Sequence, residues 1–166
     1  MQQADVERLL ELARSQVGQE FREDIGEIPR LLIQRFAAAI GEDDPLYWDI
    51  DAARAAGYAD IIAPPTLLTS IRGWSGGPRE HELRPDGSLP ETDVYLPGVR
   101  RMGAGQRVEI ISPTYPGDHL SVIQRVVGAY AKDGQSGPLV FFETESEYRG
   151  RDDEVRSRHR RTALLR

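Results

Sequence analysis

The chain has 166 residues, 39% of them apolar and 29% charged, which fits one folded domain with a single core. Its formal net charge of -6 disfavours a nucleic-acid partner, which would require a basic face. The chain contains no cysteine, which excludes disulfides and thiolate metal sites.

The first predicted element is an amphipathic helix over residues 4–17, where apolar residues recur at helical spacing. Asp5 and Glu7 lie in its first turns, which suits the helix dipole, and Gly18 ends it. This segment lacks the long apolar stretch of a signal peptide, and no run reaches the roughly 18 apolar residues of a membrane span. We therefore expect a cytoplasmic protein without a membrane segment.

Three further helices are predicted before the middle of the chain. After one strand and a turn in "QEFREDIGEIP", helical spacing resumes from Pro29 and stops at Gly41. A short helix follows over 51–56, with Asp49 or Asp51 as its N-cap. Another helix starts abruptly at Pro64-Pro65 and ends at Gly73. It is apolar on most sides, so we expect it to be the central helix of the domain.

The second half of the chain changes character. Residues 74–98 are rich in Gly, Pro and charge and predict a long loop. Two-residue alternation then predicts four antiparallel strands, at about 99–112, 118–131, 138–149 and 154–165. Helices followed by a meander of strands indicate an α+β fold, in which an uncovered sheet edge favours a dimer.

Three stretches together resemble a known family: "RFAAAIGEDDPLYWDIDAARAAGYADIIAPPTLL", "AGQRVEIISPTYPGD" and "SGPLVFFETESEYR". Over roughly residues 18–165 the chain resembles the N-terminal hot-dog domain of MaoC-type dehydratases, also called FAS1-like dehydratase domains. The resemblance implies a single hot-dog domain over 1–166, with 1–17 as an N-terminal helical extension. Its fold would be an antiparallel sheet wrapped around a long central helix.

The same resemblance implies chemistry on acyl thioesters of coenzyme A, as a lyase of fatty acid metabolism. The reaction is (R)-specific enoyl hydration or 3-hydroxyacyl dehydration, with coenzyme A as part of the substrate and no other cofactor. Such chemistry needs a carboxylate and an imidazole to move protons, and a backbone N–H to bind the thioester oxygen. It also needs an apolar channel for the acyl chain.

The proton-moving pair is altered in this chain. In active members it lies in an Asp-x-Asn-Pro-Leu-His pattern, and the matching residues here place Glu42 at the aspartate, Asp44 at the asparagine and Tyr47 at the histidine. An unperturbed tyrosine titrates near pH ~10 and an imidazole near ~6.5, so Tyr47 is a poor proton shuttle at neutral pH. Packing is an alternative role for Tyr47.

The thioester-binding element is altered as well. Counted from Glu42 by the spacing of the family, the glycine whose N–H faces the thioester oxygen corresponds to Pro65, which has no N–H. The resemblance therefore indicates a degenerate active site. Candidate substrate-binding residues are Pro65, the hydroxyl of Thr66, and Trp74 and Tyr95, which flank the long loop and could close the acyl channel.

The leading hypothesis is a subunit of a 3-hydroxyacyl-CoA dehydratase or enoyl-CoA hydratase. It would support acyl-CoA binding in a homodimer, or in a heterodimer with a catalytic MaoC-type chain. One alternative is a stand-alone hydratase or thioesterase that uses Glu42 as its carboxylate. Another is a non-catalytic acyl-CoA-binding or assembly module.

The histidines and arginines give weaker signals. His81, His119 and His159 never occur three or four apart, so a metal site built from histidine has little support, and we expect none. His159 alternates with arginines and is predicted to face solvent. Arginine clusters suit either coenzyme A phosphates or the protection of an exposed strand edge, and we favour the edge. They comprise Arg100, Arg101, Arg107, Arg156, Arg158, Arg160 and Arg161.

Overall fold

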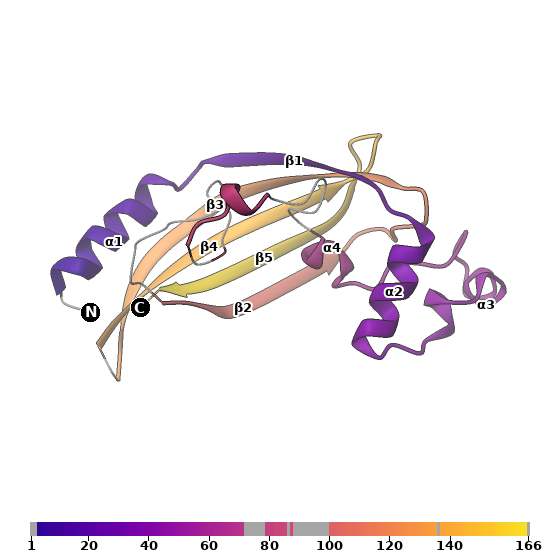
Figure 1. Ribbon diagram of the computed structural model, residues 1–166, viewed down its shortest axis with the longest axis horizontal. Coiled ribbons are helices and arrows are strands. Elements are labelled where there is room, and N and C mark those ends of the chain that lie inside the picture. Colours follow the sequence, from indigo (N-terminus) through magenta and orange to yellow (C-terminus); the bar gives the residue numbers. More distant parts are fainter. Residues whose placement is uncertain (1–2, 72–78, 86, 88–99, 136, 166) are drawn as a thin grey trace.

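The computed structural model describes residues 3–71, 79–85, 87, 100–135 and 137–165. Helical elements occupy the first half of the chain and long strands the last third (Figure 1). The elements in chain order are α1 (Gln3–Ser15), β1 (Glu20–Glu27), α2 (Arg30–Ile40), η1 (Pro45–Tyr47), α3 (Ile50–Ala55), α4 (Leu67–Ser70), η2 (Glu80–Glu82), β2 (Arg101–Ile110), β3 (His119–Gly134), β4 (Gly137–Arg149) and β5 (Val155–Leu165).

The strands form one antiparallel sheet in the order β1-β3-β4-β5-β2, so β1 and β2 are its edges. The four strands predicted for the last third of the chain are confirmed as β2 to β5. β3, β4 and β5 are neighbours both in sequence and in the sheet, because short turns join antiparallel strands directly. The α+β class expected from the alternation is therefore confirmed.

One side of the sheet, here called the inner face, carries the even-numbered residues of β4. The predicted N-terminal helix is confirmed as α1, and it covers one end of this face. Its side chains Val6, Leu9 and Ala13 are buried, since they repeat at helical spacing toward the sheet. They pack against Val126, Ala129, Val140, Phe142 and Leu165.

A second apolar cluster covers the opposite end of the inner face. It joins Ile33 of α2 and Leu67 of α4 to Val122 and Tyr148 of the sheet. α2 ends at Gly41 as predicted, because Gly41 has a left-handed φ of 71° that glycine adopts without strain. The predicted central helix is described as α4 over Leu67–Ser70, and its predicted end, residues 72 and 73, lies outside the described residues.

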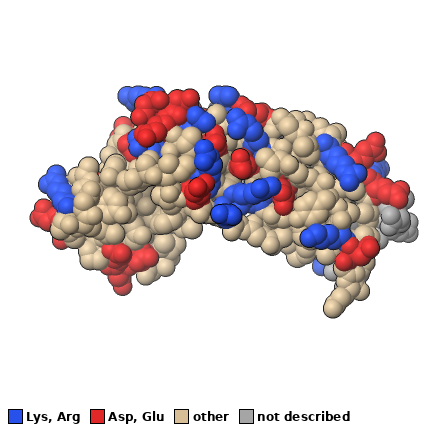
Figure 2. Space-filling view, turned by 180° about the vertical axis from the view of Figure 1, so that it is seen from behind, with Lys and Arg blue, Asp and Glu red and all other residues tan. Residues whose placement is uncertain are grey.

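The other side of the sheet, the outer face, carries paired charges, and basic side chains are interspersed with acidic ones (Figure 2). Glu147 accepts hydrogen bonds from Arg149 and, at 3.0 Å, from Arg158, while Arg160 donates to Glu143 at 2.9 Å. The Arg149 guanidinium beside Glu147 holds the pKa of that carboxyl below its usual value. The edge interpretation of the β5 arginines is wrong, because β5 lies between β4 and β2, and Arg156, Arg158 and Arg160 pair with glutamates.

The short helix α3 depends on its N-cap. The prediction of Asp49 or Asp51 is resolved in favour of Asp49, whose carboxylate accepts from the N–H groups of Asp51 at 2.8 Å and Ala52 at 3.2 Å. We expect Asp49→Ala to lower the free energy of unfolding by about 1 kcal/mol. The matched control Asp51→Ala, in the first turn of the same helix, should cost less than about 0.5 kcal/mol. Urea unfolding of both variants measures this, and equal losses would contradict the assignment.

Candidate functional site

The acidic stretch "GEDDPLYWD" forms the tight connection from α2 to α3. Asp44 accepts a hydrogen bond from Leu46 N–H at 3.0 Å and starts η1, while Asp49 caps α3. The Trp48 indole donates to the backbone oxygen of Glu42 at 2.9 Å and closes the loop. Two of the four acids in this stretch, Asp44 and Asp49, are thus accounted for as caps.

The three residues predicted to form an altered proton-moving motif lie within this connection. Glu42 and Tyr47 are half-buried and Asp44 is exposed. Burial raises the pKa of the Tyr47 phenol, and the negative charges of Glu42 and Asp44 raise it further. Tyr47 therefore stays protonated at neutral pH. It can donate a hydrogen bond beside Glu42, but it cannot exchange protons as an imidazole does.

The segment predicted to be an altered thioester-binding element lies next to this connection. The N–H of Ile62 donates to the backbone oxygen of Leu46 at 3.0 Å, which joins the chain leading into α4 to η1. Pro65 and Thr66 are exposed just before α4. The Thr66 hydroxyl makes no capping hydrogen bond to the helix, and Pro65 offers no N–H. Trp74 and Tyr95, the other two candidate binding residues, lie outside the described residues.

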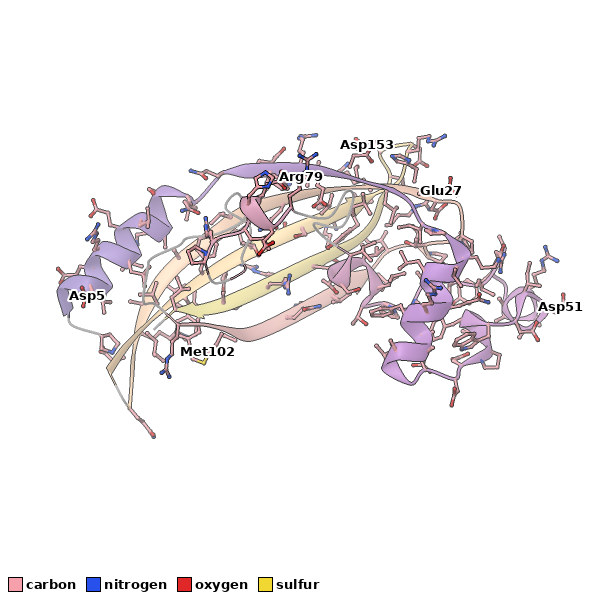
Figure 3. All side chains as sticks on the ribbon, in the orientation of Figure 1. Asp5, Glu27, Asp51, Arg79, Met102 and Asp153 are labelled. Atoms are coloured by element: carbon pink, nitrogen blue, oxygen red, sulfur yellow. The ribbon has the colours of Figure 1, made fainter. Side chains whose placement is uncertain are left out.

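The site lies at the end of the molecule that carries α2 and α3, and α1 lies at the opposite end (Figure 1). Figure 3 labels Asp51 of α3 at one end of the structure and Asp5 of α1 at the other, with the sheet between them. The sheet's inner face thus extends from the cluster beside the site, through its centre, to the cluster under α1.

His159 is buried, and the prediction that it faces solvent is wrong. It is 0% exposed, its Nε2 lies 2.9 Å from Ser157 Oγ, and its ring lies 4.6 Å from the ring of Tyr148. Desolvation lowers the pKa of His159 to about 4, with a smaller contribution from the charge of Arg161. Side chains alternate between the faces of a strand, so the outward arginines at 158 and 160 could have placed His159 inward.

The other two histidines lie at the surface. His119, at the start of β3, is 33% exposed and its Nε2 lies 2.7 Å from Asp24 Oδ1. His81 of η2 is 73% exposed. Among the residues that the structure describes, no three His, Asp or Glu side chains are grouped so that they could hold a metal ion. Within the same residues, no helix is long and apolar enough to cross a membrane.

Comparison with known proteins gives matches over most of the chain. The family model "FAS1-like, dehydratase domain region" matches residues 15–157. A UPF0336 protein of Parafrankia sp. strain EAN1pec is 35% identical over 127 residues, which cover 75% of this chain and 76% of that protein.

Solved structures with the same fold are more distant in sequence. The ChsH1-ChsH2 complex of Mycobacterium tuberculosis contains a chain that superposes with a TM-score of 0.67 at 17% identity, covering 97% of this chain and 90% of the other. A chain of the HadBC (3R-hydroxyacyl-ACP dehydratase) complex of the same organism gives a TM-score of 0.65 at 20% identity, covering 91% and 97%. These likenesses confirm the hot-dog fold.

Proposed function

Since this chain belongs to the FAS1-like dehydratase domain family, we propose that it is a subunit of a hydratase or dehydratase that acts on acyl-coenzyme A thioesters. In this proposal the chain helps to bind the acyl thioester, and a MaoC-type partner carries out the chemistry. The observation that carries it is that two features occur together. Tyr47 is held protonated beside Glu42, and Pro65, in the neighbouring segment, has no N–H. In this proposal, two separate requirements of the reaction are missing from one chain.

The residues of this chain retain part of what substrate binding needs. Tyr47 can donate a hydrogen bond, and Thr66 has an exposed hydroxyl beside Pro65. The inner face next to them is apolar through the cluster of Ile33, Leu67 and Tyr148. These three side chains are at most 1% exposed, so they support the site from within the core and do not line it.

The edge strand β2 supports the proposal of a partner. It is ten residues long, and every described side chain of the strand except half-buried Val108 is exposed. Met102 is 45% exposed and Ile110 is 47% exposed. A long, uncovered edge with exposed apolar residues is a template for another strand. The partner strand in this proposal belongs to a second copy or to a catalytic MaoC-type chain, and two of the similar solved structures are themselves complexes.

A second candidate function is a stand-alone hydratase or thioesterase. The observation in its favour is the retained carboxylate of Glu42, half-buried beside the Tyr47 hydroxyl. Glu42 would act as the base and Tyr47 as the donor. A thioesterase needs a carboxylate to direct water but no imidazole. Binding without turnover, alone and with every partner, would indicate the non-catalytic module instead.

Co-purification from the native host, followed by mass measurement of the polypeptides, tests the leading proposal. We expect a MaoC-type chain with an intact Asp-x-Asn-Pro-Leu-His motif to accompany this one. Hydration of crotonyl-coenzyme A by the isolated chain should be at least ~100-fold slower than by the complex, because acid–base catalysis contributes about that much or more. Comparable rates would overturn the proposal in favour of the stand-alone enzyme.

A further inference from the structure

The chain between α3 and α4, here called the connecting segment, comprises residues 56–66 and forms neither helix nor strand. It ends with Pro65 and Thr66 of the candidate site. A segment without a regular pattern of backbone hydrogen bonds takes its position from individual contacts with the elements around it. Those contacts therefore decide where Thr66 lies relative to Glu42 and Tyr47 of the same site.

The backbone of the connecting segment makes one hydrogen bond to η1 and one to the chain between β2 and β3. Ile62 N–H donates to the backbone oxygen of Leu46 at 3.0 Å, and Ala63 N–H donates to that of Thr114 at 2.8 Å. Ile61 is 0% exposed and lies in the apolar cluster that includes residues of α2. Apolar packing is not directional, so it holds the segment near α2 without fixing its position along the helix.

Among the described residues, Asp60 makes the one hydrogen-bonded contact between the connecting segment and α2. Arg30, the first residue of α2, donates from Nη2 to Asp60 Oδ1 at 2.7 Å and to Oδ2 at 2.6 Å. Oδ1 also accepts from the N–H of Ile61 at 2.6 Å, which fixes the carboxylate relative to its own backbone. The hydrogen bond from Arg30 holds the pKa of Asp60 below its usual value, so the carboxylate is ionised at neutral pH. A charge-assisted hydrogen bond thus joins α2 to the connecting segment.

Helix formation alone does not explain Arg30. A positive charge in the first turn of a helix opposes the helix dipole, and acidic or capping side chains are preferred there. The first turn of α2 contains no acidic residue, and Pro29 makes no side-chain capping hydrogen bond. Stability does not explain it either, because ion pairs as exposed as this one, at 43% for Arg30 and 26% for Asp60, contribute little to folding. What the pair provides is a fixed geometry between α2 and the connecting segment.

We propose that Arg30 is a positioning residue for the candidate site. The hydrogen bond of Ile62 to η1 acts as a pivot, and the contact of Arg30 with Asp60 prevents the connecting segment from rotating about it. This contact fixes Thr66 relative to Tyr47. The inference rests on the proposed function, in which Tyr47 and Thr66 help to bind the acyl thioester. Binding groups must be held within about 0.5 Å of their productive geometry, so we expect loss of the Arg30 contact to weaken binding without unfolding the chain.

Steady-state kinetics of the complex with its catalytic partner test this role. Arg30→Gln should raise the KM for crotonyl-coenzyme A about tenfold and leave kcat within about twofold, because it weakens binding and removes no reacting group. Arg30→Lys should keep the KM within about threefold, since an ammonium also donates to a carboxylate. The control Arg22→Gln breaks an ion pair of the same kind, with Glu20 at 2.7 Å on β1, and should change neither constant. An unchanged KM in Arg30→Gln would overturn the inference and leave the proposed function intact.

Hydrogen exchange of the chain tests the positioning itself, without a thioester or a partner. We expect the Ile62 amide to exchange about fivefold faster or more in Arg30→Gln than in the unmodified chain, because its hydrogen bond to Leu46 opens more often. The control Arg22→Gln should leave this rate unchanged, and the amides of β4 should be unaffected in both variants. Unchanged exchange at Ile62 would overturn the inference whatever the kinetics. If exchange at Ile62 is faster but the unmodified complex does not hydrate crotonyl-coenzyme A, the proposed function is wrong and the positioning of the segment by Arg30 stands.

Discussion

Lowering the pH from 7 to 4 is expected to reduce the free energy of unfolding by about 3 kcal/mol through His159 alone, because 1 pKa unit corresponds to about 1.36 kcal/mol. The folded-state pKa of about 4 lies below the ordinary value of 6.5. Between these values the unfolded chain binds a proton that the folded chain rejects. The contribution of neutral His159 to the free energy of unfolding is therefore complete above pH 6.5. It falls as the pH drops toward 4 and changes little below pH 4.

The matched pair His159→Leu and His119→Leu separates this effect from the titration of other groups. Protonation of carboxylates such as Glu147, whose pKa is lowered in the fold, also reduces the free energy of unfolding in acid. They do so equally in both variants, so the difference between the two urea-unfolding curves reports on His159. That difference should change by about 3 kcal/mol from pH 7 to pH 4. A constant difference would show that the imidazole is accessible to water.

Most of the fold could be predicted from the sequence because the local patterns agree with the tertiary structure. The helical spacing of Val6, Leu9 and Ala13 predicts the face that packs on the sheet. The alternation in the last third gives four strands, and three of them, β3, β4 and β5, have one buried face. The order of the strands was harder to obtain. Placing β5 inside the sheet depends on long-range pairing with β2 and β4, which no local pattern contains.

The residues of the predicted altered motif could be grouped from the sequence because they are close together along the chain. Glu42, Asp44 and Tyr47 lie within one tight connection, so their proximity follows from spacing. The neighbouring positions of three buried polar side chains on the inner face could not be identified in this way. Gln124, Ser146 and His159 come from three strands and meet only through the register. Alternation in β5 would have placed His159 inward, but its neighbours across the strands would have remained unknown.

In a complex with a catalytic partner, Glu42→Gln is expected to leave the rate of crotonyl-coenzyme A hydration within about twofold of the unmodified complex. The same acid-to-amide change at the motif aspartate of the partner should reduce the rate by about 1000-fold, because general acid–base catalysis contributes ~100- to ~10,000-fold. In the proposed assignment, the protonated Tyr47 lies beside Glu42 at the position where the catalytic motif has an imidazole. Steady-state kinetics of the two variant complexes measure the difference. If Glu42→Gln causes the thousandfold loss instead, Glu42 is the working base and this chain carries out the chemistry.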